Sequence, residues 1–154
     1  MQTGRMSRRV KPRPVSVPRT VARLLLGAVL VFAGASHLSF ARDDFQAQVP
    51  EWLPLDDDAV VLASGVVEIA LGSSLIALGR WRVAVGLVVA AFFVAIFPGN
   101  VSQLVTRTDA FGLDTDAKRW LRLPFQPLLV LVALWSTGAW RDRRVVLDRL
   151  RRRR

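Results

Sequence analysis

The polar side chains that could do chemistry are few, and most stand within or at the edge of an apolar segment of this 154-residue chain. They comprise one carboxyl, the chain's single imidazole, three amides, one guanidinium and one hydroxyl. A carboxyl and an imidazole can exchange a proton, whereas amides and a guanidinium can bind a carbonyl or anionic oxygen. The candidate residues are Glu68, His37, Asn100, Gln103, Gln126, Arg122 and Ser64.

Residue counts and motifs limit the chemistry further. The chain has no cysteine, which excludes disulfides, thiolate metal sites and thiol redox relays. One histidine cannot form a multi-histidine metal or haem site, and the chain contains no phosphate loop or dinucleotide fingerprint. We therefore predict no catalytic residue and no metal site. An enzyme is not the favoured interpretation, because the sequence contains no self-contained catalytic motif. The acidic run at 56–58 is interpreted as the start of a helix rather than as a calcium site.

Four apolar blocks must position the candidate residues. Each has roughly 18 to 22 residues, and about 20 residues of helix cross a hydrocarbon core about 30 Å thick. The blocks are apolar on nearly all sides, unlike a surface helix of a soluble protein. We predict an all-α integral membrane domain at 21–140, a four-helix bundle with left-handed packing. Its spans are expected at about 21–40, 59–78, 83–104 and 123–140.

The charged residues predict how the bundle is oriented. Most of the 22 Lys and Arg residues lie before the first block, between the second and third, or after the fourth. Most of the 12 acidic residues lie in the other two loops. By the positive-inside rule, both termini are cytoplasmic in a plasma-membrane protein. A twin-arginine-like motif at 7–11 raises the alternative of a cleaved signal, which would leave three spans.

The two ends of the chain are expected to lie outside the bundle. Segment 1–20 is rich in Pro and Arg and is predicted to be a disordered cytoplasmic tail. Segment 141–154 is predicted to be a basic tail or an interfacial helix. Arginines in both segments would contact anionic lipid headgroups. Nucleic-acid binding is not expected, because the same charges already anchor the protein to a membrane.

Small residues at heptad spacing indicate which helix faces meet. Gly27 and Gly34 in the first block, and Gly65 and Gly72 in the second, stand seven residues apart. Such residues let membrane helices approach closely, at the spacing of left-handed packing. Glu68 shares the face of the glycines in its block and lies about 15 Å inside it, near the bilayer midplane. Since the other polar candidates come from the outer half of the helices, we expect one polar cluster there.

Five short motifs occur in a characteristic order. They are FAGASHLSF at 32–40, VPEWLP at 49–54, SGVVEIALG at 64–72, FPGN at 97–100 and RLPFQ at 122–126. Their order and spacing resemble the DoxX family of small bacterial four-span membrane proteins, in which FPAN and RLPLQ are the commoner forms of the last two. The resemblance implies association with respiratory or sulfur redox complexes, some of them quinone-linked, or with oxidative-stress assemblies.

Three functions remain open from the sequence. The favoured one is an accessory or partner-binding subunit of a membrane redox or stress-response assembly, with protein partners in that assembly. The second is a quinone-reactive oxidoreductase subunit that holds a quinone head group in an outer-half pocket, and quinone is the only cofactor suggested. The third is a small transporter or a proton path through Glu68. The polar cluster also has a purely structural interpretation, in which its groups satisfy one another between helices.

Overall fold

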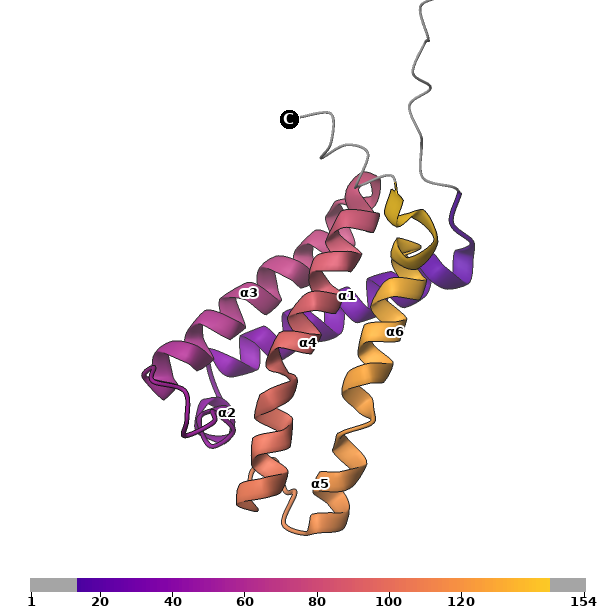
Figure 1. The fold of residues 1–154 in the computed structure, drawn as a ribbon. Helices are drawn as coiled ribbons and strands as arrows, with labels where there is room; N and C mark the ends of the chain where they lie inside the picture. The colour runs from indigo at the N-terminus through magenta and orange to yellow at the C-terminus, as the bar shows by residue number, and fades with distance from the viewer. Residues whose placement is uncertain (1–13, 145–154) are drawn as a thin grey trace, which may run out of the picture.

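The computed structural model describes residues 14–144, which form helices and no strand. The predicted tail residues 1–13 and 145–154 lie outside the described residues. A short helical stretch at 139–144 follows the last named helix. In chain order the helices are α1 (Val17–His37), α2 (Arg42–Gln46), α3 (Asp57–Ala77), the 3-10 turn η1 (Gly79–Trp81), α4 (Arg82–Thr106), α5 (Asp116–Arg122) and α6 (Phe125–Thr137) (Figure 1).

Within residues 14–144, three segments are long and apolar enough to cross a membrane: α1, α3 and the 28-residue run of η1 and α4. The predicted all-α class is confirmed, and these three segments agree with the first three predicted spans. α1 begins at Val17, four residues before the predicted block, because Pro18 fits the first turn of a helix. The acidic run does start α3, since the Asp56 side chain accepts a hydrogen bond from the Ala59 backbone N–H at 2.8 Å.

The last predicted span, over 123–140, is not one helix. The chain leaves α5 at Arg122 and enters α6 at Phe125, because Pro124 has no N–H to continue the hydrogen-bond ladder. α6 ends after 13 residues, where Gly138 adopts a φ of 72°, a left-handed conformation that glycine accepts at helix ends. At 1.5 Å per residue α6 is about 20 Å long, short of a hydrocarbon core of about 30 Å.

α1 and α3 pack with their backbones in contact. A Cβ atom added at Gly34 would lie 2.5 Å from the carbonyl oxygen of Gly65. One added at Gly72 would lie 2.5 Å from the carbonyl oxygen of Gly27. The four glycines therefore lie at the α1–α3 interface, and only the absence of a side chain allows this approach.

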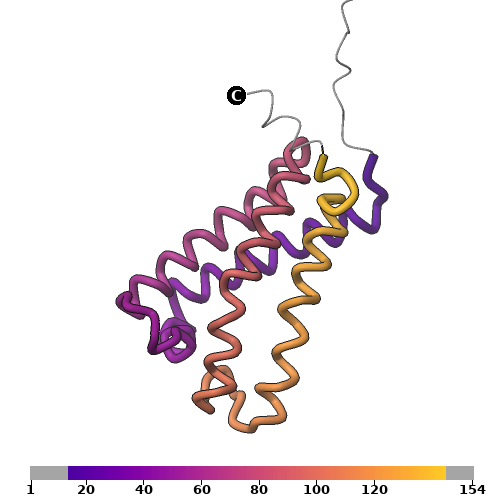
Figure 2. Tube along the Cα trace, viewed as in Figure 1, coloured from indigo at the N-terminus to yellow at the C-terminus, as the bar shows by residue number. Residues whose placement is uncertain are grey.

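α4 and α6 form a second pair, in which a Cβ atom at Gly86 would overlap the side chain of Thr137. The two pairs converge at the end where α3 passes into η1 and diverge toward α2 and α5 (Figure 2). Where the pairs meet, all four long segments contribute to one apolar core. Its buried members are Leu26, Leu30, Leu75, Val89, Ala90, Phe93 and Ala133.

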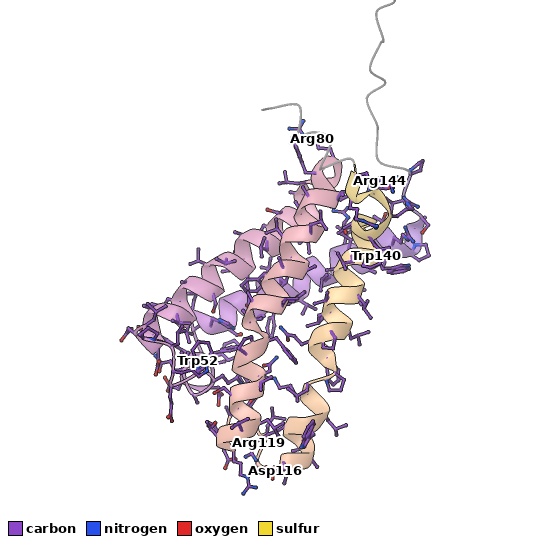
Figure 3. All side chains as sticks on the ribbon, viewed as in Figure 1. Trp52, Arg80, Asp116, Arg119, Trp140 and Arg144 are labelled. Atoms are coloured by element: carbon purple, nitrogen blue, oxygen red, sulfur yellow. The ribbon has the colours of Figure 1, made fainter. Side chains whose placement is uncertain are left out.

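Both ends of the described chain lie at the η1 end of the bundle. The Arg141 side chain donates a hydrogen bond to the Pro14 carbonyl oxygen at 3.4 Å, so the start of α1 and the segment after α6 are neighbours. α2 and α5 lie at the opposite end (Figure 1). The two ends are marked in Figure 3 by Arg80, Trp140 and Arg144 and, opposite them, by Trp52, Asp116 and Arg119.

Candidate functional site

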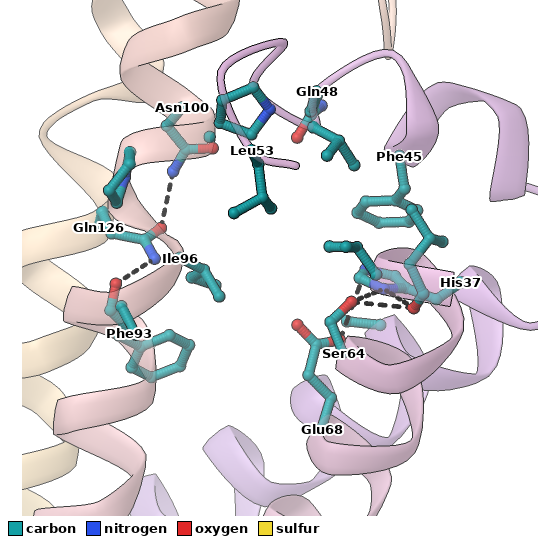
Figure 4. A pocket seen from close by; sticks show the side chains of 18 of the residues that line it. His37, Phe45, Gln48, Leu53, Ser64, Glu68, Phe93, Ile96, Asn100 and Gln126 are labelled. Carbon is teal, nitrogen blue, oxygen red and sulfur yellow. Dashed lines mark hydrogen bonds and ion pairs between the residues drawn. The ribbon is translucent and has the colours of Figure 1, made fainter. Parts of the chain in front are cut away.

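A cleft of about 370 Å³ lies between the two helix pairs, where they diverge. The segment 47–55 between α2 and α3, which we call the elbow, covers the cleft (Figure 4). The volume of the cleft lies within the range of about 300–1,000 Å³ that is common for small-molecule sites. Most of its lining side chains are apolar. Gln103 lies outside this lining, and the other predicted polar candidates are in it: His37, Ser64, Glu68, Asn100, Arg122 and Gln126.

The wall formed by α1 and α3 carries the imidazole. His37 Nδ1 lies 2.9 Å from Ser64 Oγ and 3.4 Å from the Val61 carbonyl oxygen. The Ser64 hydroxyl donates its own hydrogen to that carbonyl at 2.9 Å. The network therefore assigns the Nδ1 hydrogen to His37, which donates it to these oxygens. The Phe45 ring packs against the imidazole, tilted by 44° to it and with 3.4 Å between ring centroids, and His37 presents Nε2 to Glu68.

Glu68 stands one helical turn after Ser64 and is 5% exposed. Its Oε2 lies 3.6 Å from His37 Nε2 and has no hydrogen-bond partner among the described residues. Leaving a buried polar atom without a partner costs about 1–3 kcal/mol. Since Nδ1 is already a donor, one proton held between Nε2 and Oε2 would serve both groups, whereas a ligand hydroxyl that donates to Oε2 would serve the carboxyl alone.

Two amides join α4 and α6 on the opposite wall. Asn100 Nδ2 donates to Gln126 Oε1 at 2.9 Å, and Gln126 Nε2 donates to the Phe93 carbonyl oxygen at 2.8 Å. Phe93 lies on α4 five residues before Pro98, so the Gln126 side chain is bonded to the backbone of the helix that it faces. Figure 4 shows these amides facing His37, Ser64 and Glu68 across the cleft.

Arg122 reaches the cleft from the end of α5. Its Nη1 donates to Gln103 Oε1 at 2.8 Å, and its Nη2 donates to Gln48 Oε1 at 3.0 Å. The guanidinium carbon also lies 5.3 Å from the centroid of the Phe111 ring. These partners are neutral, and Arg122 forms no ion pair with any carboxylate in residues 14–144. A cation held in this way favours an anionic or carbonyl oxygen as a further partner.

Gln48 is a cleft residue that sequence reasoning missed. From the sequence, the stretch FQAQVPEWLP at 45–54 is expected to turn at the membrane interface. In the structure, however, the Gln48 side chain folds inward and is 9% exposed. Its Nε2 is buried without a hydrogen-bond partner in the described chain. An amide between aromatic residues is a weak signal, and the contact with Arg122, 74 positions away, follows no local periodicity. Gln103 was predicted to belong to the polar cluster, but it does not line the cleft. It is 1% exposed and accepts a hydrogen bond from Arg122.

Comparison with known proteins assigns the chain to a family. One family model matches residues 26–137, a range that contains both walls of the cleft and the elbow. The chain belongs to the family described as Domain of unknown function (DUF8561). No curated protein and no solved structure matches the chain. The DUF8561 region also contains every motif that carries the resemblance to DoxX proteins.

The lining of the cleft in this DUF8561 protein combines apolar side chains with a few polar groups. Within residues 14–144, no group of three or more His, Cys, Asp or Glu side chains could hold a metal ion. The Ser64 hydroxyl donates to a backbone carbonyl instead of to a general base, so it is not activated as a nucleophile. The apolar lining suits a ring or hydrocarbon chain, and the polar groups at opposite walls suit a head group with oxygen atoms.

Proposed function

We propose that this DUF8561 protein crosses the plasma membrane four times with both termini in the cytoplasm. The fourth crossing is made by α5 and α6 in succession, since both pack along α4. The arginine-rich η1 end then faces the cytoplasm and the end with α2 and α5 faces outward, in agreement with the positive-inside rule. Under this topology the cleft lies in the outer half of the bundle, and the basic ends of the chain contact anionic lipids.

We propose that the cleft binds a lipophilic molecule with an oxygen-bearing head, of the quinone class. The observation that carries this proposal is the Arg122 guanidinium, which has no ion-pair partner in the described chain, in an apolar cleft beside Gln48, whose Nε2 has no hydrogen-bond partner there. Both groups donate to a carbonyl oxygen of the head. Glu68, on the other wall, faces a second oxygen.

The proposed role is binding, and the chemistry belongs to a partner. The cleft supplies hydrogen bonds and one cation, but the described residues offer neither an activated nucleophile nor a metal site. The protein would hold its ligand as an accessory subunit of a membrane redox or stress-response assembly. The resemblance to the DoxX family supports this role.

Quinone binding to the full chain in lipid nanodiscs tests the proposal. Trp52 lines the cleft, so a bound quinone should quench its fluorescence in a saturable way. Arg122→Gln should weaken binding about tenfold or more, because a hydrogen bond to a charged group contributes about 1.5–3 kcal/mol. Ser74→Ala is the matched control, since the Ser74 hydroxyl bonds within α3 to the Ala70 carbonyl oxygen. If the quinone does not quench the tryptophan fluorescence of the wild type in a saturable way, the proposal is wrong.

A proton path through Glu68 is a second candidate function. It is favoured by the 3.6 Å approach of Glu68 Oε2 to His37 Nε2 and by the absence of another partner for Oε2 in the described chain. Proton flux into liposomes that contain the protein should then fall in Glu68→Gln. Flux equal to that of the wild type rejects this candidate and leaves the binding proposal in place.

A further inference from the structure

We infer that the ligand of the cleft is a membrane-dissolved molecule with an apolar tail, and that its tail leaves the cleft into the bilayer between α3 and α4. The inference rests on the proposed function, because it concerns the same cleft and the same four-span topology. It adds the route of the ligand and a requirement for a tail.

The seam between α3 and α4 is open toward the cleft. These two segments meet through η1 and separate toward their other ends (Figures 1 and 2). On α3, the cleft is lined by Val60, Ser64 and Glu68, which stand four residues apart and so share one helix face. On α4, it is lined by residues that include Ala95 and Pro98. The cleft is therefore bounded along this seam by one stripe from each segment.

The α4 side of the seam reaches the surface of the molecule. Ala95 and Pro98 both line the cleft and are exposed, so the cleft opens at these residues. Their exposed neighbours on α4 are apolar as well: Val94 is 61% and Val101 is 36% exposed. Ala95 is about 16 Å along the helix from Thr106, close to half the thickness of a hydrocarbon core. In the proposed topology this opening faces acyl chains and not water.

The aqueous end of the cleft is covered. A Cβ atom at Gly99 would lie 3.2 Å from the Gln48 carbonyl oxygen, so the elbow rests directly on α4. Phe45 of α2 packs against His37 and forms an edge-to-face contact with Phe111, with 4.6 Å between the centroids of the two phenyl rings. The Phe111 backbone N–H also donates to Asp44 at 3.2 Å, which ties α2 to the loop before α5. These contacts cover the head-group end, and the exposed apolar residues on α4 offer a long tail an exit along the seam.

Two quinones with the same ring, one with a long isoprenoid tail and one without a tail, distinguish this route. Ala95→Phe fills the opening without adding a tryptophan to the fluorescence assay. Its control is Ala91→Phe, because Ala91 is also exposed on α4, one turn away, but does not line the cleft. We expect Ala95→Phe to lower affinity for the tailed quinone about tenfold or more, since the blocked opening excludes the tail. Ala91→Phe should leave both affinities unchanged. Because Ala95 lines the cleft, Ala95→Phe is judged by the ratio of the two affinities: it should weaken the tailed quinone about tenfold more than the tail-less one, and its circular dichroism spectrum shows that it is folded.

A second measurement uses only the wild type: affinity should rise with tail length across a series of quinones. If both quinones bind the wild type but affinity is independent of tail length, the inference is overturned and the proposed binding stands. The same holds if Ala95→Phe and Ala91→Phe bind the tailed quinone equally. If neither quinone binds the wild type, the proposed function itself fails.

Discussion

Gly34→Ala is the substitution that most directly tests how the α1–α3 interface holds the cleft together. The added Cβ atom would lie 2.5 Å from the Gly65 carbonyl oxygen and 3.0 Å from the Glu68 Cβ atom. Ordinary van der Waals contact begins at 3.4 Å. The obstacle is backbone, which cannot rotate away as a side chain can, so α1 and α3 must separate by about 1 Å to restore contact.

The size of the effect follows from two opposing contributions. Overpacking a close interface costs about 1–3 kcal/mol. Replacing glycine by alanine inside a helix raises the free energy of unfolding by about 1 kcal/mol, because alanine has the higher helix propensity. The expected net loss in the free energy of unfolding is therefore about 0–2 kcal/mol, toward the upper end because the obstacle is backbone, and 1.4 kcal/mol is a tenfold change in the folding equilibrium. The same separation lengthens the 3.6 Å approach between His37 and Glu68, so quinone affinity should fall as well.

The assay is denaturant-induced unfolding of the full chain in detergent micelles, followed by circular dichroism. Gly79→Ala is the matched control, because a Cβ atom there meets nothing closer than the Arg23 side chain at 3.9 Å. Gly34→Ala should unfold at a lower denaturant concentration than both Gly79→Ala and the wild type. Equal stability of all three proteins would show that α1 and α3 are not held at backbone contact, and the description of the interface would be wrong.

Three further predictions concern other parts of the molecule. Gly86→Ala should destabilise the protein, because its Cβ atom would overlap Thr137, and the double variant with Thr137→Ala should recover much of the loss in the same unfolding assay. Lys118→Ala should raise the pKa of Asp114, which the Lys118 hydrogen bond holds below its usual range. A carboxylate NMR titration measures this change, and any stabilisation from the pair is present at neutral pH and disappears as the pH falls through the Asp114 titration. Arg119→Gln removes the ion pair with Asp109, which ties α5 to the preceding loop, and weakens the hydrogen bonding of Arg119 to the Thr108 carbonyl oxygen, so limited proteolysis should cut at 107–115 faster than in the wild type.

The candidate site divides into residues that local pattern could identify and one that it could not. Glu68 was found because a carboxyl within an apolar block is costly in lipid and therefore conspicuous. Its glycine-bearing face, deduced from a spacing of seven, is the face that meets α1 in the structure. Gln48 was missed because it lies in a short loop, where neither helical period nor burial can be deduced from the neighbouring residues.

The sequence by itself determined the all-helical class, the three helices that are apolar enough to cross a membrane, and the helix faces that carry small or polar residues, because these depend on composition and on the 3.6-residue period of one helix. Only the tertiary structure decided that the last predicted span is interrupted around Pro124 and that the two helix pairs diverge. It also decided that Gln48 and Gln103 both accept hydrogen bonds from Arg122. These features depend on how separate segments meet in space. A period within one segment carries no information about which residue of another segment lies opposite it.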